Sequence, residues 1–175
     1  MESFDTLREA LPDYARDIKI NLGNVLTPGV LNLAQCYGVA IASARAVKHP
    51  VLEHALIAAA HEAGVEQGVI DDALAAAVLM AMNNVAFRFR HKAAKEDYKD
   101  RPLRLRMQRI NAPTSTKANL ELFSLAVSTI NFCESCVNSH EEAVHQHGMT
   151  LDHVMDAVRI AATIAGAAVA LPLPR

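Results

Sequence analysis

The sequence has no tryptophan, few other aromatic residues and little glycine. Aromatic residues make up 5% of the 175 positions, and only 7 positions are glycine. Alanine, leucine and valine dominate instead, and both alanine and leucine favour helices. Apolar residues recur at helical spacing along most of the chain, whereas no convincing alternating strand pattern is present. These features exclude a sheet-rich fold and predict an all-α protein, with enough hydrophobic residues (51%) to bury a core in a single domain.

The sequence also lacks a marked excess of charge and a recognisable targeting segment. Its formal net charge is −2, which gives no general electrostatic reason to expect nucleic acid or a membrane as a partner. Residues 1–19 contain acidic side chains and no apolar segment of the kind found in signal peptides. The longest apolar run, residues 160–173, is rich in alanine and is interrupted by Pro172, so we predict no membrane span. We therefore expect a cytoplasmic protein.

Capping and breaking residues set the expected limits of the helices. Pro28 suits the first turn of a helix, and Gly64 and Gly148 suit helix ends. The expected helices cover a first segment from Asp5-Thr6 towards Lys19 with a break at Pro12, then residues 29–47, 51–63 and 69–87. Further helices are expected from a cap at Ser115 or Thr116 through Thr129, over residues 133–146, and from after Thr150-x-Asp152 to a stop at Pro172.

The predicted helices of the two halves of the chain resemble each other, which favours an internal duplication. One alignment places Gln35 opposite Glu121 and shifts by two residues further along. In this alignment Val47 and Pro50 stand where the second half has two cysteines. We divide the single domain of residues 1–175 into a non-catalytic scaffold half (1–87), a basic connector (88–114) and a catalytic half (115–175).

Cysteine is scarce, and two of the three cysteines lie close together. Cys36 stands alone, whereas Cys133 and Cys136 are separated by two residues. An odd number of cysteines without a secretory signal argues against a framework of structural disulfides. We therefore predict that the close pair is catalytic or binds a metal, and that Cys36 is a thiol of the core.

A histidine follows the close cysteine pair at helical spacing. Residues three apart at the start of a helix lie on one face, so the sulfurs of Cys133 and Cys136 can form a disulfide with modest adjustment. A helix N-terminus also stabilises a thiolate through its free N–H groups and its dipole. His140 lies one turn after Cys136 and can accept its proton, whereas it lies two turns from Cys133. The spacing predicts Cys136 as the activated thiol and Cys133 as its resolving partner.

This arrangement supports reduction of a peroxide. A thiolate attacks the O–O bond and becomes a sulfenic acid, which a neighbouring thiol converts into a disulfide. An external dithiol then reduces the disulfide by exchange. Glu121 lies in an apolar stretch before the cysteines, and antiparallel packing of the two helices would bring its carboxylate to His140. The carboxylate would then orient or protonate the imidazole.

The four residues together resemble the site pattern of the AhpD alkylhydroperoxidases, within the larger carboxymuconolactone decarboxylase-like fold. The resemblance extends over nearly the whole chain and includes Leu11–Leu22, Met80–Val85 and Lys117–Phe123 as well as Glu121, Cys133, Cys136 and His140. It implies an AhpD-like helical fold of two related halves. It also implies that Cys136 reacts with organic hydroperoxides, that Cys133 resolves the product, and that Glu121 and His140 form a proton relay.

The resemblance has further implications for partners. It implies that dihydrolipoamide reduces the disulfide, carried on a lipoylated acyltransferase and supplied with electrons by lipoamide dehydrogenase from NADH. It implies no tightly bound cofactor, a homotrimer and association with the peroxiredoxin AhpC. One position departs from the family pattern, because Ser135 stands where some members have a histidine. That departure puts in doubt an extra base acting on Cys133.

Other interpretations of the same residues stay open. Cys133, Cys136 and His140 would supply three ligands to zinc, and His145 or His147 could add a fourth, which would make a zinc-stabilised binding or scaffold protein. A general thiol–disulfide oxidoreductase is a second alternative. A decarboxylase is disfavoured, because that chemistry gives no reason for a cysteine pair.

The remaining charged features receive simpler interpretations. The basic connector has no recognisable nucleic-acid-binding motif, so we interpret it as a solvated link between the halves. Steering of an acidic lipoyl domain by these charges is a further hypothesis. His54 and His61 are interpreted as solvated or structural side chains of the scaffold half.

Overall fold

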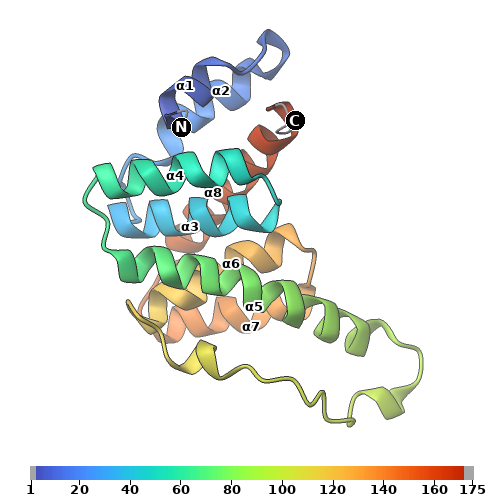
Figure 1. The fold of residues 1–175 in the computed structure, drawn as a ribbon. Coiled ribbons are helices and arrows are strands. Elements are labelled where there is room, and N and C mark those ends of the chain that lie inside the picture. Colours follow the sequence, from blue (N-terminus) through green and yellow to red (C-terminus); the bar gives the residue numbers. More distant parts are fainter. Residues whose placement is uncertain (1–2, 172–175) are drawn as a thin grey trace.

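The computed structural model describes residues 3–171, and within that range it is built from helices and contains no strand. The prediction of an all-α fold is therefore confirmed. Figure 1 shows the helices as a layered bundle, from which a long connection between α5 and α6 extends. The α-helices are α1 (Phe4–Glu9), α2 (Arg16–Val25), α3 (Leu33–Ala46), α4 (Pro50–Glu62), α5 (Gln67–Lys92), α6 (Lys117–Ile130), α7 (Glu134–Gln146) and α8 (Leu151–Ala170), with short 3-10 helices at Asp13–Ala15, Glu96–Tyr98 and Gln108–Asn111.

Several predicted helix limits are correct, and the start of α3 differs for a local reason. The break at Pro12 separates α1 from α2, and Pro50 opens α4. The predicted start of α3 at residue 29 is wrong, because a capping box begins the helix later. The Asn32 side chain accepts from the Gln35 backbone N–H (2.9 Å), while the Gln35 side chain accepts from the Asn32 N–H (3.0 Å). The predicted end of the last helix at Pro172 lies outside the described residues.

The two halves repeat in a simpler register than the sequence alignment predicted. Helices α3, α4 and α5 begin at residues 33, 50 and 67, and α6, α7 and α8 begin at 117, 134 and 151. The offset is 84 residues for each pair of helices. The same number of residues separates Gln35 from Asn119, whose side chains are hydrogen-bonded to each other. Backbone geometry agrees, because Lys48 and Phe132 both have positive φ (59° and 55°), at equivalent corners.

The constant register corrects which scaffold residues stand in place of the cysteines. They are His49 and Leu52, rather than Val47 and Pro50. The alignment failed because few side chains match between the halves, whereas the tight corner before α4 and before α7 is the same structure. Gly64 and Gly148, which have φ of 76° and 83°, likewise end α4 and α7 in the left-handed conformation that glycine tolerates.

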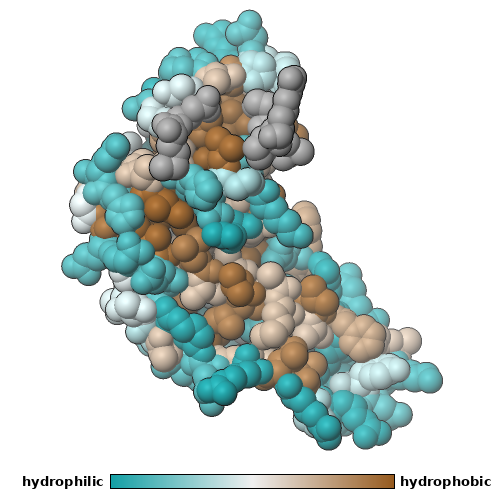
Figure 2. Space-filling view, viewed as in Figure 1, coloured by the Kyte–Doolittle hydropathy of each residue, from teal (hydrophilic) through white to brown (hydrophobic). Residues whose placement is uncertain are grey.

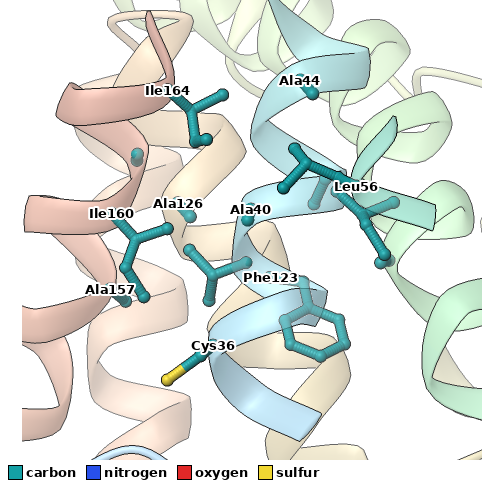
Figure 3. Packing of buried hydrophobic residues seen from close by; sticks show 14 of the residues in the cluster. Cys36, Ala40, Ala44, Leu56, Phe123, Ala126, Ala157, Ile160 and Ile164 are labelled. Atoms are coloured by element: carbon teal, nitrogen blue, oxygen red, sulfur yellow. The ribbon is translucent and has the colours of Figure 1, made fainter. Parts of the chain in front are cut away.

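Helices α3 and α6 cross at the centre of the bundle, where small residues allow close approach. Figure 3 shows the ring of Phe123 from α6 beside α3, near Ala40 and Leu56. Phe123 is fully buried, and a Cβ placed on Gly38 would lie 2.1 Å from its ring. Cys36 is also buried here, and burial raises the pKa of its thiol to about 11. It is free of any disulfide, as predicted for a core thiol.

The two longest helices of the described residues, α5 and α8, each pack against several others. By length and composition alone, α5 and α8 could cross a membrane, contrary to the prediction that no apolar run is long enough. However, α5 packs against α3, α6 and α7, while α8 packs against α2, α3 and α6. The 18-residue apolar segments of α5 and α8 are 50% and 33% buried, so packing between helices accounts for part of their apolar residues.

The basic connector is tied to the bundle rather than simply solvated. Helix α5 continues past Phe87 to Lys92, so the predicted connector begins inside it. Asp72 of α5, whose side chain is fully buried, accepts hydrogen bonds from the backbone N–H groups of Thr114 and Ser115. Arg109 also pairs with Asp72 at 2.5 Å. The end of the connector is thereby fixed against α5, just before α6 begins.

We expect Asp72→Asn to lower the free energy of unfolding by about 2 to 4 kcal/mol, because it breaks a buried ion pair and its hydrogen bonds. Burial alone would raise the pKa of Asp72, but the bonds from Thr114, Ser115 and Arg109 lower it below its usual value. The carboxylate therefore stabilises the fold fully above its unfolded pKa of roughly 4 and loses this effect as the pH falls through the folded value. Urea unfolding of both proteins measures the difference.

Asp71→Asn is the matched control, because the neighbouring Asp71 is exposed and bonds only to Gln67 of its own helix among the described residues. We expect this control to change the unfolding free energy by less than about 0.5 kcal/mol. Equal effects of the two substitutions, or an Asp72→Asn effect that does not shrink in acid, would contradict the assigned role of Asp72.

Candidate active site

The four predicted site residues lie on two successive helices joined by a tight corner. Glu121 belongs to α6, and Cys136 and His140 belong to α7. Phe132 has a positive φ at the corner and leaves its side chain 84% exposed. The sharp turn makes Cys133 the N-cap residue of α7 and directs its side chain inward, where it is 1% exposed. Figure 1 shows α7 beside the long helix α5, which it contacts.

The two cysteines of the close pair lie within disulfide-bonding distance of each other, with their Cα atoms 5.3 Å apart. This is the proximity that their spacing predicts. Their surroundings differ, because Cys136 lines a cavity of about 310 Å³, whereas Cys133 is absent from its lining. Cys136 is therefore the sulfur of the pair that a small molecule in this cavity would meet.

Glu121 forms a buried ionic cluster with His140 and with Lys117. Lys117 is not among the predicted site residues. The Glu121 carboxylate lies 2.5 Å from the Nδ1 atom of His140 and 2.6 Å from the Nζ atom of Lys117. Burial by itself would raise the pKa of Glu121, but the hydrogen bonds from His140 and Lys117 outweigh it and lower the pKa below its usual value. The carboxylate is therefore held ionised beside the imidazole.

The imidazole of His140 is fixed from both sides. Its Nδ1 atom faces Glu121, which makes Nδ1 the donor in that hydrogen bond and leaves Nε2 for other work. Nε2 lies 3.1 Å from the sulfur of Met80 on α5. Within the described residues, no hydrogen bond joins His140 to either cysteine. The two sulfurs are close enough to be bonded to each other in this structure, and a disulfide sulfur has no proton to give. His140 and Cys136 nevertheless line the same cavity.

The walls of this cavity come from three parts of the chain. Helix α7 supplies Cys136 and His140, and α5 supplies its own face opposite them. The third wall is Met107 and Ile110 of the connector, so the prediction of a solvated connector is wrong for these residues. Lys117 binds this wall too, because its ammonium group donates to the Ile110 carbonyl at 2.7 Å. Most of the lining is apolar, and it comprises Met80, Asn83, Phe87, His91, Met107, Ile110, Ser135, Cys136, Ser139 and His140.

Other predicted features lie away from this cavity. His54 and His61 are exposed on α4, in agreement with their interpretation as solvated side chains. Within residues 3–171, no group of three histidine, cysteine or acidic side chains is arranged to hold a metal ion. His145 pairs with Glu141 and with the Met149 carbonyl instead of approaching the cysteines.

Comparisons with known proteins show the family of this chain. The chain is 54% identical over 173 residues to an alkyl hydroperoxide reductase AhpD of Anaeromyxobacter dehalogenans strain 2CP-C, which covers 99% of this chain and 92% of the relative. The chain belongs to the AhpD family. AhpD proteins of Rhodospirillum centenum and Brucella suis are each 41% identical to it, over 97% of this chain and 90% and 96% of their own lengths.

The broader family model covers the part of this AhpD-family chain that carries the candidate site. The carboxymuconolactone decarboxylase family matches residues 96–172. This segment includes Glu121, both cysteines of the close pair and His140, together with the connector wall formed by Met107 and Ile110. The scaffold half lies outside the match.

Proposed function

We propose that this protein reduces organic hydroperoxides to alcohols, with Cys136 as the attacking thiolate and Cys133 as the resolving thiol. The supporting observation is that two cysteines lie at bonding distance and only Cys136 of the two lines the cavity beside His140. The AhpD relatives carry the name alkyl hydroperoxide reductase, and they match nearly the whole chain. The apolar lining of the cavity suits a substrate with a hydrocarbon body.

The proposed reaction has two chemical steps. The Cys136 thiolate attacks the terminal oxygen of the hydroperoxide, so that an S–O bond forms, the O–O bond breaks and an alkoxide leaves. The alkoxide takes a proton and becomes the alcohol. The Cys133 thiol then attacks the sulfenic acid on Cys136, forming the disulfide and releasing water. The peroxide gains two electrons, and the two thiols supply them.

The buried cluster around Glu121 supports the proton transfers in these steps. With Nδ1 held by Glu121, the Nε2 atom of His140, which now faces the Met80 sulfur, can take the thiol proton and later deliver it to the alkoxide. The negative carboxylate stabilises the imidazolium that forms between these events. The ammonium group of Lys117 partly neutralises the carboxylate, so it limits this stabilisation of the imidazolium, and it also holds the carboxylate in position. The relay thus needs no group beyond Glu121, His140 and the Cys136 that lines the same cavity.

We further propose a supply of electrons from outside the chain, with no tightly bound cofactor. A dihydrolipoamide group on a lipoylated acyltransferase would reduce the disulfide by thiol exchange, and lipoamide dehydrogenase would regenerate it from NADH. The proposal includes a cytoplasmic location, a homotrimer and service to the peroxiredoxin AhpC. Exposed apolar side chains on α5, among them Val78, Val85 and Phe89, favour assembly, and Figure 2 shows apolar surface across the middle of the visible face.

Turnover with a defined reductant tests this function. We expect the protein to consume cumene hydroperoxide when dihydrolipoamide is the only dithiol, with stoichiometric oxidation of NADH by lipoamide dehydrogenase. Omission of either the peroxide or lipoamide should stop NADH oxidation. Reduction of small disulfides without any peroxide consumption would refute the peroxidase and promote the thiol–disulfide oxidoreductase. A stoichiometric zinc ion in the purified protein would promote the scaffold alternative.

A further inference from the structure

The side chain of Asn83 is buried in the wall of the Cys136 cavity with its hydrogen-bonding capacity unused. Asn83 is 4% exposed, and its Oδ1 atom has no hydrogen-bond partner among the described residues. Folded proteins satisfy nearly all buried polar groups, so an unpartnered amide oxygen destabilises the fold and needs a reason. A cavity that holds a polar ligand would supply one.

The neighbouring Asn84 shows that packing between α5 and α6 does not require a second amide. Its Nδ2 atom donates to the Ser128 hydroxyl at 3.0 Å, and its Oδ1 atom accepts from the Asn131 side chain at 2.9 Å. The structural role is therefore filled by Asn84, which faces α6. Asn83, one residue earlier, faces a different side of the helix and lines the cavity.

The helical register of α5 places Asn83 among the residues opposite Cys136. Met80 and Phe87 lie one turn before and one turn after it, so all three share one stripe of the helix. Met80 contacts the His140 ring, and Phe87 adds apolar surface. Asn83 is thus the amide that α5 contributes to the wall across from the α7 residues, beside the apolar Met80 and Phe87 and the imidazole of His91.

We propose that the Asn83 side chain binds the hydroperoxide group of the substrate and aligns its O–O bond with the Cys136 sulfur. A hydroperoxide offers one O–H donor and two acceptor oxygens, and a primary amide offers an acceptor and a donor side by side. The Nδ2 group donates to the oxygen that carries the alkyl group, and the Oδ1 atom, which protein atoms cover in this structure, turns towards the cavity and accepts the peroxide O–H. This inference rests on the proposed reduction of hydroperoxides.

The same contact assists bond cleavage. As the Cys136 electron pair forms the S–O bond, the O–O electron pair moves onto the alkyl-bearing oxygen, which becomes an alkoxide. An N–H group already aimed at that oxygen stabilises the charge as it develops, before His140 supplies the proton. Asn83 therefore acts more strongly on the transition state than on the bound substrate.

Asn83→Leu tests the proposal by removing the amide while keeping the volume. We expect the second-order rate constant for cumene hydroperoxide with the pre-reduced protein to fall about 100-fold, the range for loss of one stabilising donor. The rate at which iodoacetamide alkylates Cys136 should be the same in Asn83→Leu as in the wild-type protein, because alkylation releases no alkoxide for Asn83 to stabilise. The melting temperature should stay the same or rise, since the variant loses an unpartnered polar group. Asn83→Ala, which adds no bulk, should show the same loss of peroxide reactivity.

Asn84→Leu is the matched control, because the change is the same but the residue is fully bonded to Ser128 and Asn131. We expect it to lower the melting temperature, unlike Asn83→Leu. Unchanged peroxide reactivity in the Asn83 variants would overturn the proposal, and so would parallel losses of peroxide reactivity, alkylation rate and melting temperature. An unreactive wild-type protein would instead refute the proposed function itself, which keeps the two failures distinguishable.

Discussion

Cys136→Ser should reduce the reaction with organic hydroperoxides to the uncatalysed background, a loss of at least about 1,000-fold. A serine hydroxyl is far less nucleophilic than a thiolate near neutral pH, and no other cysteine lines the cavity as the described residues define it. Stopped-flow mixing of the reduced variant with cumene hydroperoxide measures the remaining rate. The fold should be unaffected, because the substitution exchanges one small side chain for another at the first turn of α7.

Cys133→Ser and Cys36→Ser separate attack from resolution and from general thiol effects. Without Cys133, we expect one rapid reaction per chain that leaves a sulfenic acid on Cys136, trapped by dimedone, and no sustained turnover. Cys36→Ser should keep full activity, because that thiol is buried in the core and burial holds its pKa well above neutrality. Normal peroxide reactivity in Cys136→Ser would reverse the roles assigned to the pair.

Glu121→Gln should lower the peroxidase rate about 100-fold or more, within the range for loss of acid–base catalysis. The amide keeps the size of the side chain but loses the charge that stabilises protonated His140. It also leaves Lys117 without its carboxylate partner at 2.6 Å. We expect the effect in the rate of Cys136 oxidation, with a smaller effect on the subsequent resolution by Cys133. Single-turnover kinetics with hydroperoxide resolve the two steps.

Glu141→Gln provides the control for Glu121→Gln, because Glu141 also pairs with a histidine of α7 but at the surface. It should leave the peroxidase rate unchanged. The pH dependence gives a second check on Glu121. Because its pKa is lowered in the fold, the carboxylate stays ionised through the usual titration range of glutamate and loses its charge only in stronger acid. Equal rates for Glu121→Gln and the wild-type protein would remove Glu121 from the relay.

The sequence predicts those parts of the site that follow from helical spacing. The positions of Cys133 and Cys136 at the start of a helix, with His140 one turn later, depend only on local geometry, and the structure agrees. The contact of Glu121 with His140 needed one further assumption, antiparallel packing across a short turn. Lys117 lies one turn before Glu121, so its i, i+4 pairing could have been predicted from the same spacing rule.

Contacts between distant segments could not be predicted in this way. Met80 reaches His140 across α5 and α7, and the connector wall at Ile110 depends on the anchoring of Arg109 by Asp72. Neither contact leaves a periodic signal in the sequence. The duplication register was missed for a similar reason, because its strongest evidence is the shared backbone conformation at Lys48 and Phe132 rather than shared side chains.

The dithiol cycle of Cys136 and Cys133 can be followed by locating the disulfide after one stoichiometric dose of peroxide. Fully reduced wild-type protein is mixed with one equivalent of cumene hydroperoxide, and its thiols and disulfides are mapped by peptide mass spectrometry. We expect one equivalent of cumyl alcohol, loss of two thiols per chain, a single Cys133–Cys136 disulfide and an untouched Cys36. Peroxide that survives the mixing, or that is consumed while both cysteines of the pair stay reduced, would contradict the dithiol cycle.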